Sequence, residues 1–252
     1  MNIGRTSNPA LNKKTFTEYG RMMGREYEEG MTLNGTVNKT GILLACCTLT
    51  AAYAWSRFFA GNTSAVSGLM LLGGIGGFII AIVTIFKKPW SPITAPIYAL
   101  LEGLLLGGLS ATLEARFPGI VIQAVGLTFG TLFGLLLAYK SGLIKATENL
   151  RLGIFAAMGG IMMVYLATIV LGFFGVAVPY IHGSGIIGIG FSGFVVVIAA
   201  LNLVLDFDFI EAGCETNAPK YMEWYAAFGL IVTLVWLYIE ILRLLSKLRS
   251  RN

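Results

Sequence analysis

The chain has 252 residues, of which 56% are hydrophobic and only 12% are charged, and its net charge is +5. An ordinary soluble domain carries roughly 25% charged residues, so this composition excludes a water-exposed surface of the usual kind. The charges gather at the chain ends and in short gaps between apolar runs. That distribution is typical of membrane topology and excludes a nucleic-acid-binding patch.

Seven apolar runs are long enough to cross a bilayer as helices, which takes about 20 residues each. They cover Thr40–Phe59, Val66–Phe86, Pro92–Leu113, Pro118–Tyr139, Leu152–Phe174, Ser184–Leu205 and Trp224–Leu245. Spanning strands are excluded because they run about ten residues and alternate in polarity. We therefore predict an all-α, polytopic membrane protein with a polar N-terminal tail (1–39), a seven-helix domain (40–245) and a basic C-terminal tail (246–252).

Lys and Arg are more numerous on the side of the N-terminal tail than on the opposite side. The positive-inside rule then places the N-terminus in the cytoplasm and the helices in the cell membrane. The C-terminal end disagrees with this rule, because four basic residues lie on the predicted outer side. They are Arg243, Lys247, Arg249 and Arg251. The side of the C-terminus therefore stays open.

Glycines recur at intervals of four residues in three of the predicted helices. Small residues at this spacing share one helix face and let backbones approach closely in lipid, so we expect tight packing there. A pore-lining or hinge role is the alternative. The pattern comprises Gly73/Gly77, Gly103/Gly107 and Gly126/Gly130/Gly134.

Two glutamates lie inside apolar runs, where an acidic side chain costs about 2.5 to 3.5 kcal/mol to insert. Glu102 is midway along the third run. It is either a protonated side chain bonded to a neighbouring helix or part of an ion or proton site. Glu240 lies three residues before Arg243 in the last run, a spacing that favours an ion pair.

An acidic stretch follows the sixth run, where Asp206, Asp208 and Glu211 lie within six residues. Asp206 and Asp208 point to different sides of a helix and do not chelate a metal by themselves. The stretch is either a helix end that meets water or an acidic vestibule that attracts cations.

Enzyme chemistry has little support in this sequence, so we do not expect an enzyme. His182 is the single histidine, which excludes a histidine-rich metal site, and it lies in a predicted loop, so we do not expect a Ser–His–acid triad. Cys46, Cys47 and Cys214 show neither zinc spacing nor a disulfide framework. We expect no cofactor, although calcium is a candidate transported ion.

Two regions give the chain a resemblance to the bacterial branch of the Bax-inhibitor family of seven-helix membrane proteins. One region is Met31–Leu44, and the other combines Asn202–Ile210 with Ala226–Leu245. The resemblance implies cytoprotection and a pH-sensitive calcium leak, in which two acids on the last two helices share a proton and gate a central path.

The resemblance places the first of these acids at Asp206 and the second at Thr233, which is not an acid. It also implies a basic partner in the second helix, and that run contains no Lys or Arg before Lys87. Glu102 or Glu240 is a candidate for the lost carboxylate.

The leading hypothesis is a calcium or other cation leak channel or exchanger with Asp206 as the central acid. Asp208, Glu102 and Glu240 are secondary candidates, and few oxygen ligands surround Asp206, so calcium binding there should be weak. One alternative is a membrane scaffold or regulator that binds another membrane protein, such as a membrane protease. A proton-coupled transporter with Glu102 as the carrier is a third hypothesis.

Overall fold

The computed structural model describes residues 30–174, 183 and 185–251 as a bundle of long helices. Seven helices in this part of the chain are long and apolar enough to cross a membrane, which confirms the predicted all-α, polytopic class. A short 3-10 turn, η2 (Lys88–Trp90), precedes the third of them. The helices are α2 (Leu33–Phe59), α3 (Thr63–Phe86), α4 (Ser91–Arg116), α5 (Ile120–Lys140), α6 (Glu148–Phe173), α8 (Ile186–Glu215) and α9 (Met222–Arg249).

Several helix boundaries differ from the apolar runs, and the clearest differences arise where helices continue past the apolar segment. α2 begins at Leu33, where the Thr32 side chain caps it by accepting a hydrogen bond from the Gly35 amide at 3.0 Å. α8 extends well past Leu205, so the acidic stretch lies within a helix and not at its end. The final helix, α9, likewise continues into the predicted basic tail, as far as Arg249. Residues 1–29 of the predicted N-terminal tail, and Ser184, lie outside the described residues.

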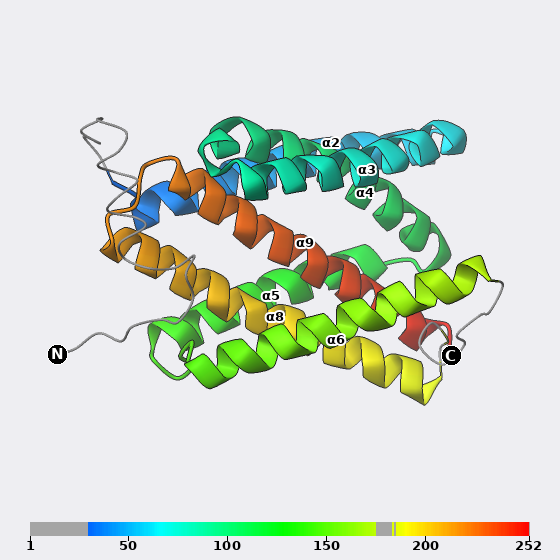
Figure 1. Ribbon diagram of the computed structural model, residues 1–252. Helices are drawn as coiled ribbons and strands as arrows, with labels where there is room; N and C mark the ends of the chain where they lie inside the picture. The colour runs from blue at the N-terminus through cyan, green and yellow to red at the C-terminus, as the bar shows by residue number, and fades with distance from the viewer. Residues whose placement is uncertain (1–29, 175–182, 184, 252) are drawn as a thin grey trace.

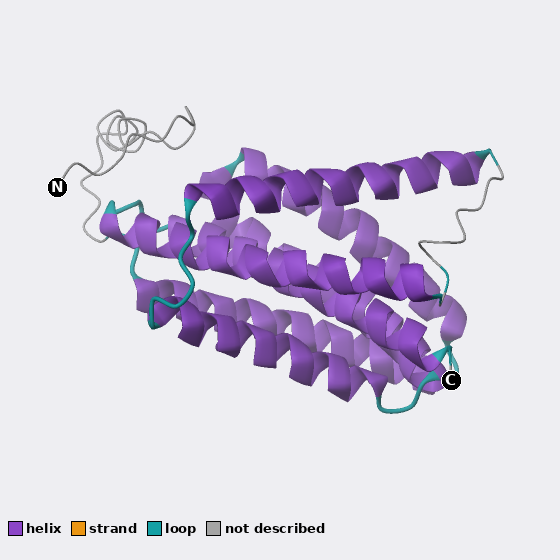
Figure 2. Ribbon diagram, turned by 90° about the horizontal axis from the view of Figure 1, so that it is seen from below, coloured by secondary structure: helices purple, strands orange, loops and turns teal. Residues whose placement is uncertain are grey.

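The last helix, α9, occupies the centre of the bundle. It packs against α2, α4, α5 and α8, whereas α6 packs mainly on α8. Figure 1 shows α9 crossing between a group formed by α2, α3 and α4 and a second group formed by α5, α6 and α8. Figure 2 shows that the helices run along one common direction, as a membrane-spanning bundle requires.

The glycine pattern produces close packing in one group of helices only. A Cβ atom placed on Gly103 would lie 2.2 Å from the Cys47 carbonyl oxygen, and one on Gly73 would lie 2.5 Å from that of Leu101. These glycines therefore let α4 approach α2 and α3 at backbone distance, as predicted. The prediction of tight packing is wrong for α5, because a Cβ atom placed on Gly126, Gly130 or Gly134 would have no neighbouring atom within 4 Å.

Candidate functional site

Asp206 lies in the interior of α8, where it faces Thr233 of α9. The Thr233 side chain is a hydrogen-bond partner of the Asp206 carboxyl group and is itself buried, with 4% of its surface exposed. Thr233 Oγ1 also accepts a hydrogen bond at 2.9 Å from Nδ2 of Asn202, which lies one turn before Asp206 in α8. A polar chain of amide, hydroxyl and carboxyl groups therefore bridges the two helices at mid-bundle.

One oxygen of Asp206 remains without a partner in the described part of the chain. Asp206 Oδ2 is buried and makes no hydrogen bond with the described residues. A buried acceptor without a partner costs free energy comparable to a lost hydrogen bond, and it is uncommon enough to call for a functional explanation. An oxygen of this kind is available to bind a proton, a water molecule or a cation.

Glu240 of α9 is a buried acid, with 2% of its surface exposed. Its Oε1 atom accepts hydrogen bonds from Arg243 at 2.7 Å and from the Tyr165 hydroxyl of α6 at 3.2 Å. Arg243 also donates to the Tyr165 hydroxyl at 2.6 Å, which closes a triangle. The predicted Glu240–Arg243 ion pair is confirmed, and Glu240 Oε2 is a second buried oxygen without a partner among the described residues.

A polar row continues along the interface of α8 and α9. Thr233, Glu240 and Lys247 recur every seven residues, so they share one face of α9. The buried Lys247 ammonium donates hydrogen bonds to the Gly188 carbonyl oxygen at 3.0 Å and to Ser192 Oγ at 2.8 Å, both in α8. The row therefore begins at the Asp206 carboxylate and ends at a lysine.

The contacts of Lys247 and Arg243 also bear on the basic C-terminal end that disagreed with the positive-inside rule. Arg243 is paired with Glu240, and Lys247 is bound to α8 inside the bundle. Lys247 is thus held within the bundle and Arg243 is paired with a buried carboxylate, so both differ from the freely solvated loop charges that the rule counts.

Asp208 and Glu211 contact different helices from Asp206. Asp208 is paired with Arg151 at the start of α6, and Glu211 accepts a hydrogen bond from the Tyr139 hydroxyl of α5. As the helical spacing predicts, Asp206 and Asp208 point to different sides of α8. Asp208 and Glu211 therefore tie α8 to its neighbours near one end of the bundle.

Glu102 lies in the other group of helices, at the interface of α4 and α3. It is buried, it is hydrogen-bonded with Tyr98 one turn earlier, and its Oε1 atom would lie 2.9 Å from a Cβ placed on Gly77. The structure does not bring Glu102 to Asp206. Of the four predicted site residues, Asp206 and Glu240 share the interface of α8 and α9, whereas Glu102 and Asp208 lie elsewhere.

A dense metal site is absent from the described part of the chain. No group of three or more His, Cys, Asp or Glu side chains there has the geometry to hold a metal ion. Calcium takes six to eight oxygen ligands in a tight site. The oxygens of Asp206, Thr233 and Asn202 fit only a weak, transient contact with a cation.

A family model described as Bax inhibitor 1 like matches residues 8–250. The chain belongs to this family. No curated protein and no solved structure matches the chain. In this Bax inhibitor 1 like protein, Asp206 and Thr233, the two positions implied by the resemblance, are in contact, and only Asp206 carries an acid.

The Bax inhibitor 1 like chain contains a further buried acid, Glu223, that the sequence analysis missed. Glu223 is fully buried at the start of α9. Its Oε1 atom accepts hydrogen bonds from the Thr32 amide and hydroxyl, both at 2.8 Å, and lies 3.2 Å from the Lys220 ammonium. Lys39 of α2 binds the other oxygen. We call Glu223, Thr32, Lys39 and Lys220 the Glu223 clasp.

The clasp joins the first described residues to the loop between α8 and α9. The Met31 amide donates a hydrogen bond to the Ala218 carbonyl oxygen at 2.7 Å, and Gly30 forms an isolated β-bridge with Pro219. Thr32 and Lys39 both lie within Met31–Leu44, one of the two regions that carry the family resemblance. Two polar residues at the start of an apolar helix mark this end of α2 in the sequence, but they do not identify Glu223 as the partner.

Proposed function

We propose that this Bax inhibitor 1 like protein is a pH-sensitive leak channel or exchanger for calcium, or another cation, in the cell membrane. Its N-terminus lies in the cytoplasm. The observation that carries the proposal is the Asp206 carboxylate at the interface of α8 and α9, whose buried Oδ2 oxygen has no partner among the described residues. Ionisable groups inside a membrane bundle are costly and typically belong to ion or proton pathways.

The polar row on α9 supports a path along the same interface. A cation that reaches Asp206 meets the Thr233 hydroxyl and then, two helical turns further, the second unpartnered carboxylate oxygen at Glu240. Beyond Glu240, the buried Lys247 ammonium and Arg243 repel cations. This arrangement suits a slow leak, because a cation is attracted to the middle of the path and opposed at one end.

The pH sensitivity follows from the chemistry of a carboxylate. Asp206 attracts a cation only in its ionised form, so protons compete with cations for the same oxygen. The groups close to Asp206 are the neutral side chains of Thr233 and Asn202, whereas Arg151 of α6 is occupied by Asp208. The proposed gate is a single acid beside a hydroxyl group, and it differs from the pair of acids that the resemblance implies.

Calcium flux into proteoliposomes, measured at several pH values, tests the proposal with two matched substitutions. Asp206→Asn mimics the protonated acid, so its flux should equal the low-pH limit of the wild type at every pH. Asp208→Asn makes the same chemical change two residues away on another side of α8, and it should keep the pH dependence.

Two results would contradict the proposal. A pH-dependent flux that persists unchanged in Asp206→Asn would remove Asp206 from the path. No flux above empty vesicles at any pH would instead favour a membrane scaffold that binds another membrane protein, such as a membrane protease. In that case deletion of residues 1–29 should abolish partner binding while the helix bundle still forms.

A further inference from the structure

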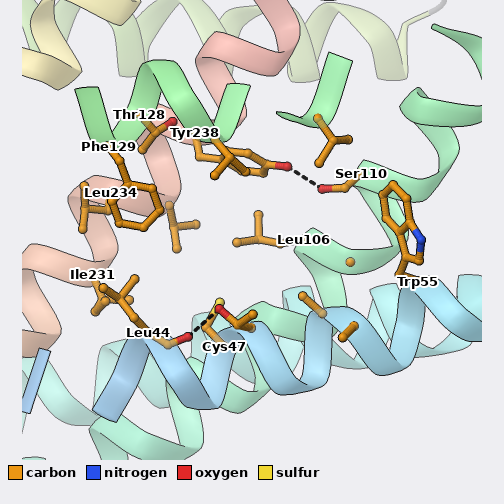
Figure 3. A pocket seen from close by; sticks show the side chains of 17 residues that line it. Leu44, Cys47, Trp55, Leu106, Ser110, Thr128, Phe129, Ile231, Leu234 and Tyr238 are labelled. Atoms are coloured by element: carbon orange, nitrogen blue, oxygen red, sulfur yellow. Dashed lines mark hydrogen bonds between the residues drawn. The ribbon is translucent and has the colours of Figure 1, made fainter. Parts of the chain in front are cut away.

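A large cavity lies on the side of α9 that faces α2, α4 and α5. Its volume is about 450 Å³, within the range of pockets that hold small organic ligands. Figure 3 shows Trp55 and Leu44 of α2, Leu106 of α4, Phe129 of α5 and Leu234 of α9 arranged around its open centre. The polar row lies on a different face of α9, so the cavity is separate from the proposed ion path.

The wall of the cavity is apolar and carries no charged residue. The hydroxyl groups of its wall are already bonded within the protein. Ser110 Oγ and the Tyr238 hydroxyl bond each other at 2.7 Å, and the Thr128 hydroxyl donates to the Ala124 carbonyl oxygen at 2.8 Å. Figure 3 shows the Ser110–Tyr238 bond at one edge of the cavity. The cavity therefore suits a hydrocarbon and does not suit an ion.

The cavity opens sideways, between α2 and α5. Both helices pack against α9, but they make at most marginal contact with each other. Thr48 and Ala52, which line the cavity from α2, are exposed on the outer surface of the bundle. Because these helices cross the membrane, the opening faces the acyl chains of the bilayer.

The long axis of the cavity matches one leaflet of a bilayer. The lining residues of α2 run from Leu44 to Trp55, about 16 Å at 1.5 Å per residue. Half of a hydrocarbon core about 30 Å thick is about 15 Å. The cavity ends near the last turn of α2 and, at Val121, in the first turn of α5, so it extends from mid-bundle to one membrane surface.

Two exposed arginines lie at that surface. Arg57 is in the last turn of α2, and Arg116 is the last residue of α4. Arginine forms bidentate hydrogen bonds with phosphate groups. The apolar cavity and the basic rim together match the two parts of a phospholipid.

We propose that this cavity binds one acyl chain of a bilayer phospholipid, whose phosphate lies at the rim formed by Arg57 and Arg116. The acyl chain enters between α2 and α5 and contacts Leu234 and Tyr238 of α9. The site does not depend on the proposed ion flux, because α9 separates it from Asp206.

Photolabelling in proteoliposomes tests the site directly. The probe is a phosphatidylglycerol with a diazirine in one acyl chain, and mass spectrometry locates the labelled residues. Labels should concentrate on the cavity walls of wild type. The paired substitutions Ala52→Phe and Val125→Phe fill the cavity and should lower this labelling about tenfold, equivalent to about 1.4 kcal/mol of binding free energy.

The matched control is Ala45→Phe with Ile122→Phe, on the same two helices. Both control positions are exposed and lie outside the cavity wall, so labelling should stay at the wild-type level. Elution profiles and thermal midpoints in detergent check that both double variants fold. If the filled variant does not fold, the distribution of labels on wild type still decides the question.

The rim is tested with a photoactivatable diacylglycerol that carries the same acyl chain but no phosphate. The phospholipid should label the cavity more strongly, and Arg57→Gln with Arg116→Gln should remove that preference. Labels spread evenly over the outer faces of the helices would overturn the proposal. Equal labelling in the filled and control variants would overturn it too, as would recovery of a free fatty acid but no phospholipid from the purified protein.

Discussion

Thr233 of α9 lies against Asp206 of α8 and accepts a hydrogen bond from Asn202, one turn earlier in α8. The family resemblance implies an acid at each of the two facing positions, and this chain has one acid and one hydroxyl. The two positions therefore face each other as the resemblance implies, but the pair of side chains differs. Two adjacent carboxylates share one proton, because ionising both at once is costly. An acid beside a hydroxyl has no such partner and titrates alone.

Restoring the second acid should change how the flux depends on pH. We expect Thr233→Asp to convert a profile with one titration step into one with two, because the neighbouring carboxylates titrate as a coupled pair. Thr233→Asn is the control, since it adds a polar group of similar size that does not titrate. Flux measured against pH in proteoliposomes gives the result, and a single unchanged step in Thr233→Asp would contradict the assigned contact.

Glu240 and Arg243 should show energetic coupling. Arg243→Gln leaves the buried Glu240 carboxylate without its cation, so it should destabilise the protein more than the double substitution Glu240→Gln with Arg243→Gln. A double-mutant cycle on detergent-solubilised protein should give a coupling energy of about 1 to 3 kcal/mol. Strictly additive effects would mean that the pair does not act as a unit.

Loss of charge at the Glu223 clasp should destabilise the bundle. Glu223→Gln removes a buried carboxylate that receives two bonds from Thr32 and pairs with Lys39, and breaking a buried pair costs about 3 to 5 kcal/mol. The midpoint of thermal unfolding in detergent should fall clearly. Glu148→Gln, at an exposed position in the first turn of α6, should leave it nearly unchanged. Equal midpoints for the two variants would argue against the clasp.

Glycine substitutions should separate the closely packed helices from the open ones. Gly103→Ala places a methyl group 2.0 Å from Thr50 Oγ1 and 2.2 Å from the Cys47 carbonyl oxygen. It should cost about 1 to 3 kcal/mol, because α2 and α4 must move apart. Gly130→Ala meets nothing within 4 Å and should be neutral or stabilising by up to about 1 kcal/mol. Thermal midpoints of the two variants compare these effects.

Hydropathy alone predicted the seven helices, since every apolar run of sufficient length became a helix. It did not predict where the helices end, because helices extend beyond the apolar segment when a cap or a tertiary contact stabilises the extra turns. The Thr32 cap starts α2 early, and contacts of Asp208 and Glu211 with α6 and α5 hold the extended end of α8. Spacing also could not tell which glycine face meets a helix, so Gly126 was assigned a packing role that it does not have.

The candidate site was predicted only in the parts that local spacing determines. The Glu240–Arg243 pair follows from its spacing of three residues, and the separation of Asp206 from Asp208 follows from helical geometry. Glu223 was missed because its partner Thr32 is 191 positions away, and no local pattern brings them together. The same holds for Tyr165, which reaches Glu240 from another helix.

The Glu223 clasp also orders events during synthesis. Thr32 and Lys39 enter the membrane region with the first helix, but the anion that they bind is supplied by the last helix of the bundle. The partners of this contact are 191 and 184 positions apart, so it forms only after the intervening helices have been made. Before α9 is made, Lys39 of α2 lacks the buried carboxylate that it binds in the finished bundle, so the clasp cannot stabilise α2 until α9 is in place.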